Sequence, residues 1–164
     1  MVESLSGMKI YLMRHGHCPS LLEAGLKSDA LRPLSERGRK DVRKAGRYLA
    51  AKGVRPGLIL CSPLLRAQQT AQELAAVLGN SEVRPFEALA NIIPGAELAR
   101  VATTTDWASP EVVLVGHMPQ IAEAAAQFLN TPLNFSPAEI AAFEVTGQGK
   151  ASLLWKAAPE QMPE

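Results

Sequence analysis

The chain has 164 residues, of which 47% are apolar and 20% charged, and its formal net charge is +1. This length and composition are typical of one folded domain with a substantial core. A net charge near zero argues against nucleic acid or an anionic membrane as a partner, and no apolar run approaches the ~20 residues of a membrane span. The two cysteines, Cys18 and Cys61, indicate a reducing compartment rather than a disulfide scaffold, so we expect a cytoplasmic protein.

The first predicted strand, residues 8–13, ends abruptly in polar residues. Its apolar run stops at Met13 and is followed by Arg14, His15 and Gly16. In an open α/β sheet, ligands bind beyond the carboxyl ends of the strands, and a glycine there allows a sharp turn and close approach to the backbone. A three-residue motif also occurs by chance, so the rest of the chain has to decide whether this one is functional.

The elements that follow alternate between helix and strand. Ser35 is a candidate N-cap for a helix that runs to about residue 52, with a basic outer face that we expect to be solvated. The pattern then predicts strands at 58–61, 82–85 and 111–116, helices at 63–78, 94–105 and 119–129, and a hairpin from 140–145 and 151–155. This order predicts an α/β fold, a three-layer α/β/α sandwich with a mainly parallel sheet and one antiparallel element near the C-terminus.

The ends of the chain carry weaker patterns than the rest. Residues 1–7 have no clear periodicity, and none is evident from residue 158 onward. We therefore expect a single domain over residues 8–157 with loose termini at 1–7 and 158–164.

Two further strand ends carry polar residues like those after the first strand. Ser62 and Arg66 follow the strand at 58–61, and Gly116-His117 ends the strand at 111–116. Because parallel strands place their carboxyl ends on one edge of the sheet, two histidines and two arginines are expected to meet there. Arginines bind phosphoryl oxygens in a fixed geometry, one imidazole attacks phosphorus, and a second donates a hydrogen bond to developing charge. This composition predicts a phosphoryl-transfer site.

Four motifs together resemble the histidine phosphatase superfamily, whose fold is phosphoglycerate mutase-like. They are Arg14-His15-Gly16-His17, Arg32-Pro33-Leu34-Ser35-Glu36-Arg37-Gly38, Ser62-Pro63-Leu64-Leu65-Arg66-Ala67-Gln68-Gln69-Thr70 and Val115-Gly116-His117. Within the superfamily the chain looks most like the short bacterial phosphohistidine phosphatases. The likeness runs from about Met8 to Trp155, and separate motifs in the same order are much more specific than any one alone.

The resemblance implies a specific role for each of four residues in these motifs. His15 would be the nucleophile that becomes phosphorylated, Arg14 and Arg66 would clamp the phosphoryl oxygens, and His117 would complete the pocket. Water would then hydrolyse the phosphohistidine intermediate. The family uses no metal and no organic cofactor.

Four other residues are secondary candidates. Arg32 matches an additional phosphate-contacting arginine of the short branch, although it would otherwise be a surface residue before a proline. Gly16 and His17 would lie beside the substrate, and His17 either touches it or hydrogen-bonds the loop. Glu87 is a possible proton donor, with a surface or helix-capping role as the alternative. Because the phosphorus–nitrogen bond is labile, phosphohistidine needs such an acid less than an alkyl phosphate ester does.

The expected activity is removal of phosphate from phosphohistidine on a protein, such as a histidine-containing phosphotransfer domain of a signalling system, with inorganic phosphate as product. Residues 88–111 are too few for a large lid, and an uncovered site accepts a side chain on a folded protein. Two alternatives stay open: a broad-specificity small-molecule phosphomonoesterase of the same superfamily, and a non-catalytic regulator that binds phosphate or phosphoprotein.

A metal site is a further alternative. His15 and His17, with Cys18 and His117, would supply four ligands. The neighbouring arginines disfavour this alternative, since they repel a divalent cation and attract an anion.

Overall fold

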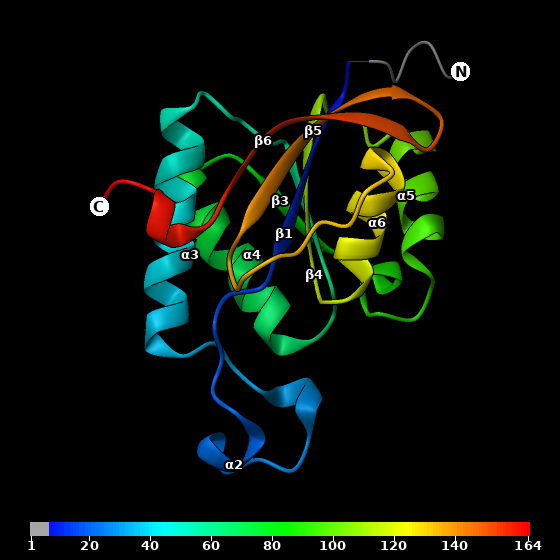
Figure 1. The fold of residues 1–164 in the computed structure, drawn as a ribbon. Coiled ribbons are helices and arrows are strands. Elements are labelled where there is room, and N and C mark those ends of the chain that lie inside the picture. Colours follow the sequence, from blue (N-terminus) through cyan, green and yellow to red (C-terminus); the bar gives the residue numbers. More distant parts are fainter. Residues whose placement is uncertain (1–6) are drawn as a thin grey trace.

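The computed structural model describes residues 7–164 as a single sheet between two layers of helices (Figure 1). The strands are β1 (Lys9–Arg14), β2 (Leu58–Cys61), β3 (Glu82–Pro85), β4 (Glu111–Gly116), β5 (Ile140–Gly147) and β6 (Lys150–Ala157). The helices are α2 (Leu21–Ala24), α3 (Glu36–Ala51), α4 (Leu65–Leu78), α5 (Gly95–Thr104) and α6 (Gln120–Leu129). Short 3-10 turns lie at η1 (Asp29–Leu31), η2 (Glu87–Leu89) and η3 (Pro159–Gln161).

The strand order in the sheet is β3-β2-β4-β1-β5-β6. The pairs β3–β2, β2–β4 and β4–β1 are parallel, whereas β5 runs antiparallel to both β1 and β6. The predicted three-layer α/β/α fold with a mainly parallel sheet and an antiparallel C-terminal element is therefore confirmed. It is the phosphoglycerate mutase-like fold.

The central strands are apolar except for residues at their ends because helices cover both faces of the sheet. Along β1, Ile10 and Leu12 pack into the core beneath α5 and α6, while Tyr11 and Met13 pack into the core beneath α3 and α4. Successive side chains of a strand point to opposite faces, so a strand buried on both faces has no polar alternation. The two helix layers are visible on either side of the sheet in Figure 1. The central strands are thus rigid supports for the residues that follow them.

The start of α3 is capped as predicted. The Ser35 hydroxyl accepts a hydrogen bond from the Gly38 N–H at 3.0 Å. The start of α4 differs from the prediction, because the helix begins at Leu65 rather than at Pro63. The Ser62 hydroxyl accepts the Leu64 N–H at 3.2 Å, and this contact holds a turn between the strand and the helix.

The C-terminal segment is packed rather than loose. Pro159–Gln161 form η3, and Met162 is only 4% exposed within the core beneath α3 and α4. The expectation of a loose tail is wrong for these residues, since apolar side chains anchor them to the sheet layer. At the other end, residues 1–6 of the expected loose terminus lie outside the described residues. No helix within residues 7–164 has the length and apolar character to cross a membrane.

Candidate active site

The carboxyl ends of β1 and β4 lie side by side and place two histidines together. Arg14 pairs with Gly116 in the parallel ladder, and the His15 N–H donates to the Gly116 carbonyl at 3.1 Å. His117 follows Gly116 directly, so the two imidazole rings lie close together, with centroids 5.1 Å apart and planes tilted by 57°. The register of the sheet, which the buried apolar faces fix, therefore sets the distance between the histidines.

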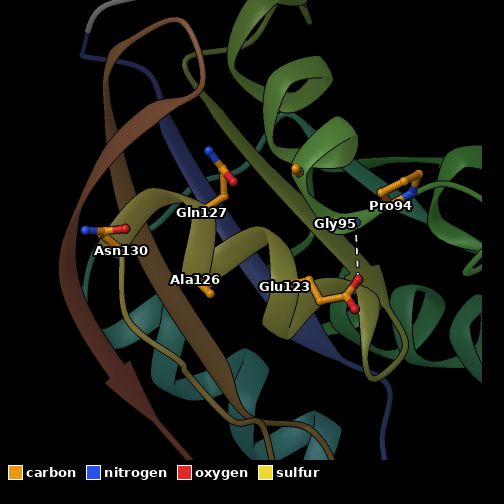
Figure 2. A pocket seen from close by; sticks show the side chains of 7 residues that line it. Pro94, Gly95, Glu123, Ala126, Gln127 and Asn130 are labelled. Atoms are coloured by element: carbon orange, nitrogen blue, oxygen red, sulfur yellow. Dashed lines mark hydrogen bonds between the residues drawn. The ribbon is translucent and has the colours of Figure 1, made fainter.

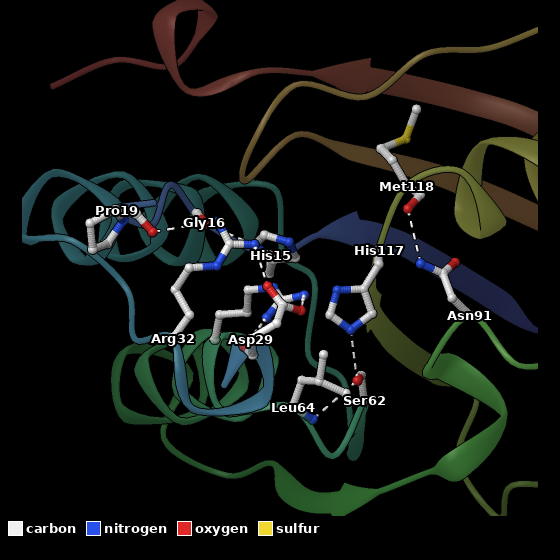
Figure 3. A network of polar contacts seen from close by, with 11 residues as sticks. His15, Gly16, Pro19, Asp29, Arg32, Ser62, Leu64, Asn91, His117 and Met118 are labelled. Atoms are coloured by element: carbon white, nitrogen blue, oxygen red, sulfur yellow. Dashed lines mark hydrogen bonds and ion pairs between the residues drawn. The ribbon is translucent and has the colours of Figure 1, made fainter. Parts of the chain in front are cut away.

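A pocket of about 280 Å³ opens at this edge of the sheet. The predicted residues that line it are Arg14, His15, Gly16, His17, Arg32, Arg66 and His117, and Cys18, Asn91, Met118 and Pro137 complete the lining. Residues from six separate segments thus converge on one small space. Figure 3 shows His15, Arg32 and His117 at its centre. This is the convergence that the strand-end motifs predict.

Glu87 is not brought into this pocket. It begins η2 with an exposed side chain, and it is not among the lining residues. The turn of η2 instead directs Leu89 into the core, where it is fully buried. Glu87 therefore lies at the surface, because the buried apolar residue of this turn decides which way the others face.

Three arginines supply the positive charge of the pocket. The Arg66 guanidinium is buried and donates to the Asp29 backbone carbonyl at 2.8 Å and to its carboxylate at 2.9 Å. The same carboxylate lies 3.1 Å from Arg32, and Arg14 donates to the Phe135 carbonyl at 2.9 Å. The Nε atoms of all three arginines are buried and have no hydrogen-bond partner among residues 7–164. Buried donors without partners are costly, so the arrangement favours an anion that would accept from them.

Asp29 is a site residue that the sequence reasoning missed. It lies on η1 in the loop between β1 and α3, which extends beyond the carboxyl edge of the sheet (Figure 1). Its spacing of three residues from Arg32 was visible in the sequence and is the geometry of a local ion pair. Its contact with Arg66, 37 residues away, depends on how the loop folds back over α4 and has no local signal.

The His15 ring is neutral and has a defined orientation. Its Nδ1 lies 2.9 Å from the Gly16 carbonyl, which can only accept, so Nδ1 carries the proton and Nε2 keeps a lone pair. Burial lowers the pKa of His15 to about 3, against a raising contribution from the Gly16 carbonyl and with a further lowering by neighbouring cationic groups. At neutral pH the ring is therefore an unprotonated potential nucleophile.

The His117 ring is also buried and neutral. Burial first, and then the charge of Arg66, lowers the pKa of His117 to about 4. Its Nε2 lies 2.7 Å from the Ser62 hydroxyl, whereas its Nδ1 is buried with no partner. The free nitrogen lies on the side of the ring that faces the His15 and Asp29 side chains (Figure 3).

These lowered pKa values predict that the free energy of unfolding falls as the pH falls. The folded pKa of His15, about 3, lies below its ordinary value of 6.5, so between these values the unfolded chain binds a proton that the folded protein excludes. This contribution to stability is fully present above pH 6.5 and is lost as the pH falls toward 3. From pH 7 to about 4.5, the free energy of unfolding should fall by about 2 kcal/mol more in the wild type than in His15→Asn, as measured by urea denaturation. An equal fall in both proteins would contradict the assignment.

Hydrogen bonds from α3 and α4 fix the loop that carries these residues. The Gly16 N–H donates to the Thr70 hydroxyl at 3.1 Å, and the His17 Nδ1 lies 2.7 Å from the Ser35 hydroxyl. Gly38 allows the close approach, because a Cβ there would lie 2.0 Å from the His17 carbonyl oxygen. His17 thus hydrogen-bonds the loop and also lines the pocket.

A second hollow, of about 450 Å³, lies between α5 and α6 and differs in chemistry (Figure 2). Its charged lining residue is Glu123, whose carboxylate accepts the Gly95 N–H at 3.3 Å. A hollow with a carboxylate and no cationic side chain does not suit an anion. Among residues 7–164, no three His, Cys, Asp or Glu side chains gather closely enough to hold a metal ion.

Comparison with known proteins agrees with this geometry. The sequence profile of the histidine phosphatase superfamily (branch 1) matches residues 10–98. The chain is 27% identical over 158 residues to the phosphohistidine phosphatase SixA of Escherichia coli K12, covering 93% of this chain and 94% of that protein. It is 37% identical over 122 residues to an uncharacterized protein of Picosynechococcus, covering 72% and 71% of the two chains.

The fold agrees as well. The solved structure of the protein histidine phosphatase SixA in complex with tungstate superposes with a TM-score of 0.82 at 25% identity, covering 93% of this chain and 97% of that one. The profile match spans the strand ends that carry His15 and Arg66, and the structural likeness extends to the segment with His117. The chain belongs to the histidine phosphatase superfamily and is a phosphatase.

Proposed function

We propose that the protein removes phosphate from phosphohistidine on another protein, through a phosphohistidine intermediate of its own. The observation that carries this proposal is the pocket itself, in which the free Nε2 of His15 lies among buried, unpartnered donors of Arg14, Arg32, Arg66 and His117. Two comparisons support it, since a relative is named a phosphohistidine phosphatase and its structure holds tungstate, a phosphate-like oxyanion.

In the first proposed step, the Nε2 lone pair of His15 attacks phosphorus. A bond forms between Nε2 and phosphorus while the phosphorus–nitrogen bond of the substrate breaks, and the leaving imidazole takes a proton from solvent. Arg14 and Arg66 bind the non-bridging oxygens, with Arg32 as an additional contact and Gly16 and His17 beside the substrate. His117 donates a hydrogen bond to the charge that develops.

In the second step, water attacks the phosphorus of the intermediate. The bond to Nε2 of His15 breaks, inorganic phosphate is released, and the neutral ring is restored. Both steps use only side chains and water, so the proposed reaction needs no metal or organic cofactor. We propose residues 8–157 as the catalytic domain, acting in the cytoplasm on a phosphorylated partner such as a histidine-containing phosphotransfer domain.

The lining of the pocket favours a phosphohistidine substrate over an alkyl phosphate ester. Among the described residues no Asp or Glu lines it. The nearby Asp29 carboxylate is paired with Arg66 and Arg32, and Glu87 lies outside. An alkoxide leaving group requires a proton donor, whereas an imidazole leaving group departs more readily without one. The pocket is also small, with a volume of about 280 Å³, and this size suits a single side chain rather than an enclosed metabolite.

A substrate panel tests this proposal. Phosphohistidine protein, phosphoglycerate, sugar phosphates and p-nitrophenyl phosphate are compared by kcat/KM under identical conditions. We expect the phosphohistidine protein to be preferred. Preference for phosphoglycerate or a sugar phosphate would instead identify a small-molecule phosphomonoesterase, and stoichiometric binding without turnover would identify a non-catalytic regulator.

Inorganic oxyanions are expected to inhibit competitively. Phosphate, sulfate and tungstate should raise KM and leave kcat unchanged, because they occupy the same guanidinium donors as the phosphoryl group. Arg32→Ala should weaken tungstate inhibition by about tenfold, since a hydrogen bond to a charged group contributes about 1.5–3 kcal/mol. The matched control is Arg43→Ala, whose guanidinium pairs with Glu73 away from the pocket. Non-competitive inhibition, or equal effects of the two substitutions, would contradict the site.

A further inference from the structure

Ser62 lies beneath the His117 ring at the start of the turn into α4, and it is fully buried. Its hydroxyl oxygen is 2.7 Å from Nε2 of His117 and accepts the Leu64 N–H at 3.2 Å. Figure 3 shows the hydroxyl between the two groups. Within residues 7–164 the Ser62 side chain makes no other hydrogen bond, so these contacts define what its single proton can do.

The hydroxyl has one proton to donate, and its backbone contact does not use it. The Leu64 N–H is a donor and therefore occupies a lone pair of the Ser62 oxygen. The hydroxyl proton is left free to point at Nε2 of His117, the only acceptor among its partners. If Nε2 accepts a hydrogen bond from this hydroxyl, the neutral imidazole must carry its own proton on Nδ1.

The choice of tautomer decides whether the other ring nitrogen of His117, Nδ1, carries a proton. Nδ1 of His117 is buried, has no hydrogen-bond partner in the part of the chain that the structure describes, and belongs to a residue that lines the anion pocket. Protonated, it is a donor for an oxyanion; unprotonated, it would present a lone pair to negative charge. A neutral ring contributes to the pocket only in the first of these forms.

We propose that Ser62 is a positioning residue that holds neutral His117 in the Nδ1–H tautomer, so that this N–H donates to an oxygen of the bound phosphoryl group. The inference rests on the proposed function for the identity of the anion. It assigns to Ser62 a role that acts through His117 without touching substrate. In the absence of the hydroxyl, the ring would divide between its two tautomers, and the donor form would be only partly populated.

The direct test is the tautomer of His117, read by long-range ¹H–¹⁵N correlation NMR on histidine-labelled wild-type protein at neutral pH with tungstate. We expect the proton on Nδ1 in the wild type and a mixture of tautomers in Ser62→Ala. Ser62→Thr, which keeps the hydroxyl, should restore the wild-type pattern. A proton on Nε2 in the wild type would overturn the proposal by itself, whether or not the variants fold, and so would an unchanged tautomer in Ser62→Ala.

Kinetics supply an independent readout. Ser62→Ala should lower kcat/KM about tenfold, an effect of the size expected for one hydrogen bond, and Ser62→Thr should recover most of it. The matched control is Ser81→Ala, whose hydroxyl donates to the Pro56 carbonyl at 2.7 Å, outside the pocket lining, and which should stay within about twofold of wild type. In a His117→Ala background the effect of Ser62→Ala should disappear, since the two residues act as one unit. Full additivity of the two losses would overturn the proposal.

The two readouts also separate this inference from the proposed function. The NMR measurement depends only on anion binding, so the Nδ1–H tautomer with tungstate supports the role of Ser62 even if the preferred substrate is a small phosphate ester. Conversely, turnover of phosphohistidine protein together with an Nε2–H tautomer would leave the function in place and overturn the role of Ser62.

Discussion

Replacing His15 by alanine is expected to lower kcat/KM toward a phosphohistidine protein by more than about 10³-fold. Loss of a single electrostatic donor already costs about 10²–10³ in rate at such sites, and loss of the attacking atom removes the covalent route altogether. The neutral Nε2 of His15 lies among unpartnered cationic donors, and no other histidine combines these features. Initial rates over a range of substrate concentrations measure the effect.

His17 is the matched control for this substitution. It belongs to the same loop and lines the same pocket, but its Nδ1 is engaged by the Ser35 hydroxyl at 2.7 Å. His17→Ala should therefore lose far less activity than His15→Ala. Equal losses in the two variants would point to a general disruption of the loop, and undiminished turnover in His15→Ala would overturn the mechanism.

Arg66→Ala is expected to have the second largest effect, a loss of about 10²–10³ in kcat/KM. The guanidinium is 6% exposed, and Asp29 holds it by two hydrogen bonds of 2.8 and 2.9 Å. A desolvated donor that is fixed in place stabilises the charge of the transition state more than a mobile donor does, because it needs no reorganisation during the reaction. Arg66→Lys should recover only a small part of the activity, since an ammonium cannot reproduce the two-point geometry.

The control for Arg66 is again Arg43→Ala. Arg43 also makes two hydrogen bonds to one acidic residue, in this case both to the Glu73 carboxylate, but it does so on the exposed face of α3. Its removal should change kcat/KM by less than about twofold, because exposed ion pairs contribute little to stability and this one lies outside the pocket. A comparable loss from both substitutions would show that the Arg66 effect reflects folding rather than chemistry.

The fold and the centre of the site were predictable from the sequence because the core imposes them. The strand at 111–116 is apolar after Glu111 since both faces of the sheet are covered, and this pattern separates such strands from the amphipathic helices. Once the strands are parallel, their carboxyl ends share an edge, and the residues that follow them must meet. The positions of His15 and His117 follow from that register alone.

The irregular segments were less predictable because their contacts are not local. Asp29 is a site residue because it binds Arg66, which lies in another element. Asn91 lines the pocket, and its side-chain amide donates to the Met118 carbonyl at 3.0 Å. Glu87 lies outside the pocket because the burial of Leu89 decides the orientation of its turn. In each case a tertiary contact, rather than a sequence pattern, selects the side chain that faces the pocket.

The most direct test of the central claim is to find the phosphoryl group on the enzyme. Brief incubation with ³²P-labelled phosphohistidine protein, followed by a rapid alkaline quench and peptide mapping, should recover an acid-labile, base-stable label on His15, attached at Nε2. The same experiment on His15→Ala should recover none. Label on a serine, or on another histidine of the wild-type chain, would contradict the account.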